Sequence, residues 1–466
     1  MRVINKARGK IEKIWGKQTL KDTQYRLFKY VLQTEYEDGL LLHNVVSGEL
    51  IQLNKKEKEL LEMFPSKADS NCSELIEKHF LVPVDYNEKK TVGQLRTLLR
   101  AMQKKDAITG YTILPTSYCN ARCFYCYECD YEHIHMSEET AKRAVDYIHK
   151  HSKGKKISIG WFGGEPLVGE KIISLISKEL KEKNVEFSSN MISNGFLFDE
   201  ELVKKAAEDW KLKNVQITID GTEDVYNKVK DYINPKGSPY KRVLNNIRLL
   251  SEAGIRVSIR INLGFHNEDD TQNLIEELSE YFKECKNVSM YVHELFENEG
   301  TNPRSYSEEE KNHLTKKVIE LNDYIAEKGK YSQGKSLPSL RTNHCMADSN
   351  VSVIIQPDGG LSKCEHYTVK DEFGSIYSKE CNQEKLKEWK VYTELEKCGE
   401  CPLYPSCVML KGCPDTGDCN VAKQKKGMED AVKNMVCFAE KKGQTEEAED
   451  SFSEDTDDIG SNDKNC

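Results

Sequence analysis

Cysteine is the residue type in this sequence whose spacing most clearly indicates chemistry. Residues 118–127 read YCNARCFYCY and place Cys119, Cys123 and Cys126 within eight positions. Thiolates at such short spacing ligate iron–sulfur clusters or zinc. Three of them would leave one iron of a [4Fe–4S] cluster open to another ligand, whereas a fourth from Cys129 would close a zinc site. Zinc sites usually pair two short knuckles across a longer loop, so the cluster with an open iron is favoured.

A second group of cysteines lies toward the C-terminus. Nine of the sixteen cysteines fall between residues 345 and 437, where regular patterning is sparse. Such a segment needs metal or crosslinks to hold it together. Because the chain is long and shows no export signal, metal ligation is favoured over disulfides. A zinc ribbon within residues 398–413 remains the alternative to iron–sulfur ligation.

Composition and charge exclude several classes of function. Hydrophobic residues make up 38% of the 466-residue chain, and no apolar run reaches the roughly 18–20 residues of a membrane span. The stretch MRVINKARGKIEKIW lacks the continuous apolar run of a secretory signal. The net charge of −9 arises mainly from residues 445–464, which hold nine acidic residues and one lysine. We therefore expect a cytoplasmic protein whose near-neutral body binds neither membrane nor nucleic acid.

The first cysteine group directly follows the first of six strand candidates. These candidates are residues 111–114, 157–162, 187–192, 215–219, 257–262 and 288–293. Amphipathic helix patterns, such as residues 137–151 and 240–254, lie between them. Six strand–helix repeats predict an α/β fold in which parallel strands form a partial (β/α)6 barrel. Functional groups are then expected at the carboxyl ends of the strands.

The N-terminal part has a different pattern. Residues 30–53 contain short β-rich runs separated by turn signals at Glu37-Asp38-Gly39 and Ser47-Gly48. Helix patterns follow at residues 55–64, at 73–80 and around 92–104. Together they predict a small winged-helix-like module. A plain N-terminal extension that packs on the next domain is the alternative.

Changes of pattern divide the chain into five regions. They are a winged-helix-like module (1–105), the partial barrel (106–300), a helical bridge (301–340), a loop-rich cysteine domain (341–440) and an acidic tail (441–466). The tail combines high charge with few apolar residues, so it is expected to be disordered.

The stretch CNARCFYC resembles the signature loop of the radical S-adenosylmethionine (radical SAM) enzymes, with Tyr125 as the aromatic residue before the last cysteine. Four further elements match in order, each at a predicted strand end: Gly163-Gly164-Glu165-Pro166, Ser193-Asn194-Gly195, Thr218-Ile219-Asp220-Gly221 and Arg260-Ile261-Asn262. The resemblance implies that S-adenosylmethionine binds the open iron and yields a 5′-deoxyadenosyl radical, so that Cys129 is a bystander. The implied cofactor-binding residues are Tyr125, Gly163, Gly164, Glu165, Ser193, Asn194, Asp220 and Arg260.

The C-terminal cysteines resemble the SPASM domain, an extension that holds two auxiliary [4Fe–4S] clusters, which would bring the total to three. By that family's crossed arrangement, one auxiliary cluster would use Cys398, Cys401, Cys407 and Cys437. The other would use Cys345, Cys364 and Cys413. The sequence departs from the pattern at Cys413, which follows Cys407 after five residues instead of three, and Cys419 is an extra candidate. The second set therefore leaves an iron open for a substrate thiolate, unless Cys419 completes it.

Glu365 directly follows Cys364. In relatives that mature sulfatases, an acidic residue at this point is a proposed proton acceptor, and a carboxylate beside a cluster suits that role. The alternative is a group that only hydrogen-bonds near a cluster ligand. Both interpretations remain open from the sequence.

The stretch EDGLLLHNVVSGELIQLN resembles the peptide-recognition element of enzymes that modify ribosomally made peptides. It implies a precursor peptide whose leader binds at residues 25–105. The radical SAM resemblance implies in addition a flavodoxin- or ferredoxin-type electron donor. The sequence is thus identified as a radical SAM/SPASM peptide maturase, an oxidoreductase that forms thioethers between cysteine sulfur and carbon. The alternatives are an anaerobic sulfatase-maturating (formylglycine-forming) enzyme, a carbon–carbon crosslinking or other peptide-modifying enzyme, and a non-catalytic iron–sulfur or zinc scaffold.

Overall fold

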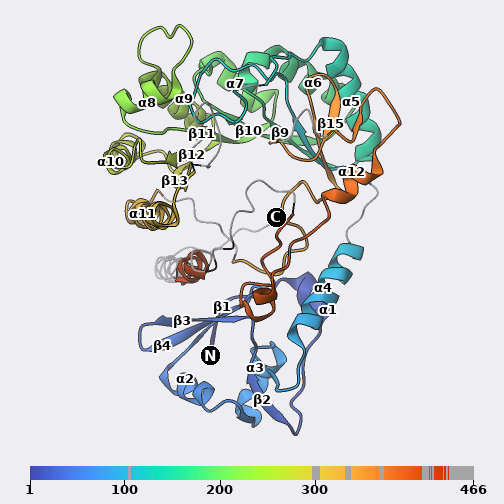
Figure 1. The fold of residues 1–466 in the computed structure, drawn as a ribbon, viewed down its shortest axis with the longest axis vertical. Helices are drawn as coiled ribbons and strands as arrows, with labels where there is room; N and C mark the ends of the chain where they lie inside the picture. The colour runs from blue at the N-terminus through green and yellow to red at the C-terminus, as the bar shows by residue number, and fades with distance from the viewer. Residues whose placement is uncertain are drawn as a thin grey trace, which may run out of the picture.

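The computed structural model describes residues 1–102, 107–129, 131–295, 305–330, 337–366, 372–411, 419, 421, 425–433, 435–436 and 439. The molecule is elongated, with a parallel-sheet body at one end and the N-terminal strands and helices at the other (Figure 1). Segments from the cysteine-rich region, drawn in orange, lie between these two parts (Figure 1).

The body is built on one large sheet. Its nine strands have the order β13-β12-β11-β10-β9-β8-β14-β15-β16. The six central strands run parallel to one another: β8 (Gly110–Ile113), β9 (Ile157–Trp161), β10 (Phe187–Ser193), β11 (Leu212–Thr218), β12 (Arg256–Leu263) and β13 (Val288–Glu294). The prediction of six parallel strands in an α/β fold is confirmed.

Helices cover one face of this sheet. They are α5 (Glu138–Ser152), α6 (Glu170–Glu182), α7 (Glu200–Glu208), α8 (Glu223–Lys230), α9 (Pro239–Glu252) and α10 (Thr271–Tyr281), with the 3₁₀ turn η2 (Pro166–Gly169) before α6. Local sequence fixes where they begin. In α5, for example, the Ser137 hydroxyl accepts a hydrogen bond from Thr140 N (3.0 Å), and Glu138 and Glu139 follow in the first turn, where carboxylates suit the helix dipole.

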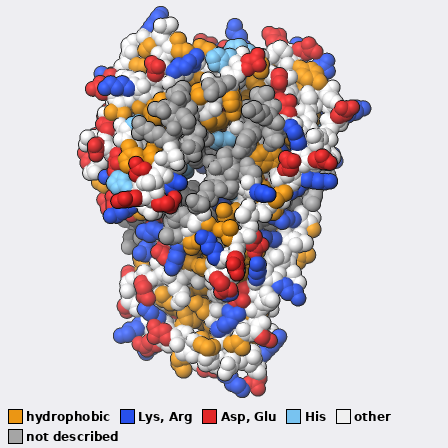
Figure 2. All heavy atoms as spheres, viewed as in Figure 1, with side chains coloured by type: hydrophobic (Ala, Val, Ile, Leu, Met, Phe, Trp, Pro, Cys, Tyr) orange, Lys and Arg blue, Asp and Glu red, His pale blue; other side chains and the backbone are white. Residues whose placement is uncertain are grey.

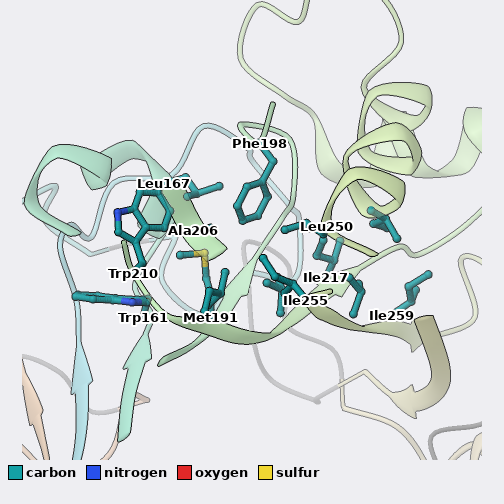
Figure 3. Close-up of a cluster of buried hydrophobic side chains, with 14 of the residues drawn as sticks. Trp161, Leu167, Met191, Phe198, Ala206, Trp210, Ile217, Leu250, Ile255 and Ile259 are labelled. Atoms are coloured by element: carbon teal, nitrogen blue, oxygen red, sulfur yellow. The ribbon is translucent and has the colours of Figure 1, made fainter. Parts of the chain in front are cut away.

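The core forms between these helices and the strands. Alternate residues of each strand face it, as in β9, where Ile157, Ile159 and Trp161 are buried. Figure 3 shows its centre, where side chains from neighbouring strands meet Trp210 and Leu250. The labelled strand residues are Trp161, Met191, Ile217 and Ile259.

The cysteine-rich region extends the sheet. Strand β14 (Ser352–Ile355) pairs in parallel with β8, and β15 (Gly360–Ser362) and β16 (Gly374–Ser375) follow in antiparallel order. The sequence prediction treated residues 341–440 as loop-rich and did not include this extension. The short helix α12 (Gln383–Glu388) and the 3₁₀ turn η3 (Glu396–Glu400) complete the elements of this region.

Helix α11 (Glu308–Glu327), in the predicted bridge, packs on the edge strand β13. Its buried residues Leu314, Val318, Leu321 and Ile325 join the main core. The Asn322 side chain forms hydrogen bonds with the backbone of β13. Its amide oxygen accepts from Val292 N (2.8 Å), and its amide nitrogen donates to Val292 O (3.0 Å). The edge of the parallel sheet is therefore covered rather than open.

The N-terminal part contains two small sheets around their own core. One has the antiparallel order β1-β5-β4-β3, formed by β1 (Arg2–Asn5), β5 (Leu50–Leu53), β4 (Gly39–Asn44) and β3 (Val31–Tyr36). The other has the order β6-β2-β7, formed by β6 (Ser66–Lys67), β2 (Gln24–Leu27) and β7 (Leu81–Pro83). The helices are α1 (Gly9–Trp15), α2 (Lys55–Glu62), η1 (Ser70–Cys72), α3 (Ser73–Glu77) and α4 (Glu88–Met102).

Contacts join this N-terminal part to the rest of the chain. Arg96 of α4 donates to the carbonyl oxygens of Tyr404 (2.5 Å), Pro405 (3.1 Å) and Cys407 (3.0 Å). On the sheet, His43 Nε2 lies 2.9 Å from Pro338 O. No helix in the described ranges is long and apolar enough to span a membrane. On the face shown in Figure 2, basic and acidic side chains of the described residues are interspersed.

The buried His43 predicts a pH-dependent stability. Burial lowers the pKa of His43 to about 4, whereas the unfolded chain has a pKa of about 6.5. The unfolded state therefore binds a proton that the folded state excludes, and stability falls as the pH drops from 6.5 toward 4. Between pH 7.5 and 5.5 we expect His43 to account for a loss of about 1 kcal/mol.

Urea unfolding at the two pH values measures this effect. The His43→Gln variant should be less stable at pH 7.5 but lose less stability on acidification than the unmodified chain. His149→Gln, at an exposed position of α5, is the matched control and should retain the full pH dependence. Equal slopes for His43→Gln and the unmodified chain would contradict the prediction.

Candidate functional site

The first cysteine group lies at the carboxyl end of the parallel strands, as expected. Cys119, Cys123 and Cys126 follow β8 on one loop, and Cys126 N donates to Cys123 O (3.1 Å). The sulfur of Cys119 accepts from Ala121 N (3.4 Å) and contacts the Asn194 amide (4.0 Å). Amide hydrogen bonds to sulfur are a feature of iron–sulfur sites.

Burial controls the ionisation of these thiols. It raises the pKa of both Cys119 and Cys126 to about 12, and nearby carboxylates, Glu165 and Glu128 respectively, raise it further. Burial also raises the pKa of Cys123. Buried thiols of this kind become thiolates when a cation replaces the proton, as iron does. The donor set therefore fits an iron–sulfur cluster.

The distance between thiols differs between a cluster and a single ion. Within the described ranges, no three His, Cys, Asp or Glu side chains converge closely enough to hold one metal ion. Around a single zinc, with Zn–S of about 2.3 Å, the sulfurs come within about 4 Å of one another. In a [4Fe–4S] cluster each cysteine binds a different iron, so the sulfurs stand further apart.

Two glycines bring the segment after β9 against the cysteine loop. A Cβ at Gly163, where φ is +117°, would lie 2.2 Å from Thr116 O, and one at Gly164 would lie 2.6 Å from Ser117 O. The next residue, Glu165, donates its backbone N–H to Tyr118 O (3.0 Å). Only glycine permits this approach, so Gly163 and Gly164 position the loop that carries the cysteines.

Glu165 connects three of the predicted elements. Its fully buried carboxylate accepts from the Ser193 hydroxyl (2.9 Å), from Asn194 N (2.8 Å) and from Leu167 N (3.1 Å). Burial raises the pKa of Glu165 to about 7, against the effect of these hydrogen bonds. Asn194 in turn donates to the Asn120 side chain (2.7 Å) on the cysteine loop. The structure thus brings together residues that the sequence placed after three different strands.

Lys230 is the main residue of the site that sequence reasoning missed. It is 2% exposed, and its ammonium lies 2.9 Å from the carboxylate of Asp220, which is 0% exposed. Lys230 also donates to the Tyr125 hydroxyl (2.8 Å) and to Thr218 Oγ1 (2.7 Å), and Tyr125 hydrogen-bonds to Asp220. Burial disfavours both charges, yet their mutual attraction raises the pKa of Lys230 and lowers that of Asp220. Nothing in the local sequence of α8 distinguishes this lysine from exposed ones.

The same pair is tied to the cysteine loop and to β12. Lys230 O accepts from Arg122 N (2.9 Å) between Cys119 and Cys123. Asp220 Oδ1 accepts from Asn262 N (3.0 Å), and the Asn262 side chain accepts from Arg260 Nε (2.8 Å). Tyr125, Asp220 and Arg260, all predicted as cofactor-binding, therefore belong to one hydrogen-bonded network.

A cavity of about 350 Å³ lies against the strands of the parallel sheet. Its lining includes strand residues that alternate with those of the core, together with Glu365 from the cysteine-rich region. The residues with polar side chains are Thr112, Asn190, Asn214, Gln216, Ser258 and Glu365. Amide and hydroxyl groups dominate this set, and Glu365 is its only charged member among the described residues.

Aromatic stacking joins Glu365's neighbour to the cysteine loop. The rings of His366 and Tyr127 stack with centroids 4.3 Å apart, and Tyr131 donates to His366 O (2.9 Å). On the same loop, burial raises the pKa of Glu128 to about 7. Its Oε1 atom has no hydrogen-bond partner among the described residues. Glu128 is a second residue that sequence reasoning missed.

Most of the second cysteine group occupies two places among the described residues, while Cys381 lines a separate cavity beside α5. Cys345 accepts a hydrogen bond from Ala347 N (3.3 Å), and Cys364 packs in a small cluster with Trp389 and Leu410. The other place holds Cys398, Cys401, Cys407 and Cys419, which line one cavity. Cys413 and Cys437 lie outside the described residues.

Comparison with known proteins agrees with the class of this site. Residues 113–278 match the model of the radical SAM superfamily. Members of this superfamily use S-adenosylmethionine and a [4Fe–4S] cluster. The site described above lies largely within these residues.

Relatives and solved structures extend the similarity. The chain is 22% identical to the radical SAM cyclopropyl synthase TigE of Paramaledivibacter caminithermalis, over 66% of this chain and 70% of that protein. It is 23% identical to a cysteine-type anaerobic sulfatase-maturating enzyme of Clostridium novyi, over 63% of this chain and 84% of that enzyme. The fold is similar to that of anSMEcpe with bound AdoMet and the Cp18Cys peptide, with a TM-score of 0.52 and 18% identity, over 72% of this chain and 99% of that one.

The buried ion pair predicts a large effect of substitution. Lys230→Met leaves Asp220 buried without its cation, so we expect a loss of about 3–5 kcal/mol of stability. The double variant Lys230→Met/Asp220→Asn removes both charges and should recover part of that loss. Urea unfolding, followed by the fluorescence of the core residues Trp161 and Trp210, measures both.

Lys205→Met is the matched control, because Lys205 forms an exposed ion pair with Glu201 on α7. It should not change the unfolding midpoint measurably. A Lys230→Met variant as stable as this control would show that the buried pair does not hold the loop.

Proposed function

We propose that this chain is a radical SAM peptide maturase that forms thioether bonds between a cysteine sulfur and a carbon of another residue in a ribosomally made precursor peptide. One observation carries the proposal most directly. Glu365 borders the cavity against the barrel strands, while the adjacent His366 stacks on Tyr127 of the first cysteine loop. The first cysteine loop, the cavity and the segment that follows Cys364 therefore lie together, which supports a reaction on a substrate thiol.

Each part of the site has a role in this proposal. Cys119, Cys123 and Cys126 would hold the [4Fe–4S] cluster, and the predicted cofactor-binding residues would surround S-adenosylmethionine. When bound, the cluster and S-adenosylmethionine supply the abstraction of a hydrogen atom from an unactivated carbon. The two auxiliary clusters would accept the second electron, and a flavodoxin- or ferredoxin-type protein would be the reductant.

The residues around the cavity suit a peptide segment. Amide side chains such as Asn190 and Gln216 can hydrogen-bond to a peptide backbone. Glu365 would take the proton that the substrate thiol loses as its sulfur bonds to carbon. The new bond replaces one C–H and one S–H bond, so the peptide loses two hydrogens and two electrons.

The N-terminal sheet offers a binding edge for a leader. Strand β3 pairs only with β4 in the described structure, which leaves its other edge available. Exposed Gln33 and Glu35 lie on this strand. A peptide that adds as a further strand gains affinity from main-chain hydrogen bonds.

Co-expression tests the reaction. A cysteine-containing peptide encoded beside the gene should lose two hydrogens per crosslink and one alkylatable thiol. A carbon–carbon crosslink would lose two hydrogens but keep every thiol. Anaerobic protein that cleaves no S-adenosylmethionine under reductant, or that holds zinc without iron, would point to a scaffold instead.

Sulfatase maturation is the second candidate, supported by the similarity to the Clostridium novyi enzyme. Formylglycine formation consumes a thiol without linking a second residue, and its aldehyde reacts with a hydrazide. A hydrazide-reactive product from a sulfatase peptide, with no crosslink in the co-expressed peptide, would favour this candidate.

Leader binding at β3 can be tested by removing one N–H group. Tyr36 and Gly39 flank a two-residue turn, so hydrogen-bonded pairs alternate from there and the N–H of Gln33 points away from β4. Gln33→Pro should weaken binding of a labelled leader about tenfold, the cost of about 1.4 kcal/mol for lost hydrogen bonds. Gln33→Ala keeps the N–H group and should bind like the unmodified chain. Equal affinity of all three proteins, measured by fluorescence anisotropy, would contradict leader binding at this edge.

The role of Glu365 predicts a separation of two activities. Glu365→Gln keeps the shape of the side chain but cannot accept the thiol proton, so crosslinking should fall about 100-fold or more. Cleavage of S-adenosylmethionine should persist, because Glu365 is not part of the network around the first cysteine loop. Equal losses of both activities would assign Glu365 to the structure of the site instead.

A further inference from the structure

Four cysteines line one cavity of about 470 Å³ between α4 and the cysteine-rich region. They are Cys398, Cys401, Cys407 and Cys419. The first three come from the turns of residues 396–407, where Cys401 N donates to Cys398 O (3.2 Å). Cys419 reaches the same cavity from a later part of the chain, and its thiol is within electrostatic range of both Cys401 and Cys407.

Packing holds the chain near Cys419 in this place. Val421, two residues further on, packs against a buried cluster that includes Leu32, Val45 and Leu403. Cys401 packs against the same cluster. Cys401 and Val421 thus pack on the same apolar cluster. This packing keeps Cys401 and Cys419 close together, independently of any metal.

Polar groups around the cavity suit a cluster of iron and sulfur. The sulfur of Cys398 accepts a hydrogen bond from Leu395 N (3.3 Å), and such bonds tune iron–sulfur clusters. Arg96 and Arg100 of α4 line the same cavity, and Arg96 binds the carbonyl oxygen of Cys407. Lys397 lines it as well, beside Glu394 and Glu400, so cations outnumber carboxylates in the lining and partly offset the negative charge that four thiolates bring.

We propose that Cys419 completes a four-cysteine centre with Cys398, Cys401 and Cys407. The occupant by charge and donor type is a [4Fe–4S] cluster, and this identification rests on the proposed function. The ligand set departs from the SPASM pattern, in which the distant last cysteine completes this group. With this ligand set, Cys419 is no longer available as the fourth ligand of the other auxiliary cluster, the one assigned to Cys345 and Cys364.

Differential alkylation of the holo-protein tests the ligand set without changing the contested cysteine. A metal-bound thiolate is unavailable to iodoacetamide, so loss of the centre exposes its remaining ligands. In a Cys398→Ala variant, purified anaerobically with iron, we expect Cys401, Cys407 and Cys419 to react about tenfold faster than in the unmodified chain. Cys437 should keep its original rate.

The matched control is Cys345→Ala, which disrupts the other auxiliary set and should leave the rate of Cys419 unchanged. Exposure of Cys437 with Cys401 and Cys407, while Cys419 keeps its rate, would overturn the assignment. Equal acceleration of all cysteines in both variants, as from general unfolding, would also count against it.

Metal analysis separates this inference from the proposed function. Iron in the unmodified chain that falls by about a third in Cys398→Ala fits one of three clusters. Zinc in place of iron, with the same alkylation pattern, would uphold the four-cysteine centre but contradict the radical SAM/SPASM proposal. A chain without metal whose four cysteines react freely would overturn the inference.

Discussion

The carboxyl end of the parallel sheet depends on one buried ion pair, between Lys230 and Asp220. Two charges without solvent are tolerated only because every polar atom around them is satisfied, by Tyr125, Thr218 and the backbone of Asn262. The same groups fix the loop that holds the first three cysteines to the ends of β11 and β12. The geometry of the candidate site is therefore held by polar contacts that would be costly to break.

A second constraint comes from the buried thiols themselves. Burial raises the pKa of Cys119 and Cys126, so as bare side chains they would be neutral and chemically quiet. A bound cation reverses this preference, because the thiolates then neutralise it. Burial likewise raises the pKa of Cys401 and Cys407 in the second cysteine-lined cavity. Burial of these thiols therefore works against free thiolates in both places.

The N-terminal part, the parallel-sheet body and the cysteine-rich region are joined more closely than their sequence patterns indicate. Strand β14 extends the parallel sheet beside β8, and Arg96 of α4 donates to the carbonyl oxygen of Cys407. The aromatic pair of Tyr127 and His366 links the first cysteine loop to the segment that follows Cys364. In the proposed function, these contacts place the leader-binding edge, the cavity and the auxiliary centres on one framework, so a peptide held at β3 would be held near the site of reaction.

The sequence by itself determined the α/β fold, the six parallel strands and the motifs at their ends, because alternation, glycines and short cysteine spacings are local properties. Gly163, Glu165 and Asn194 could be expected from the resemblance of their motifs to those of radical SAM enzymes. Only the tertiary structure decided that Lys230 is buried against Asp220, that residues 352–355 extend the sheet and that Cys419 lies beside Cys401 and Cys407. Each of these depends on which distant segments meet, and a lysine or cysteine carries the same local signal whether it ends at the surface, in a core or beside a metal.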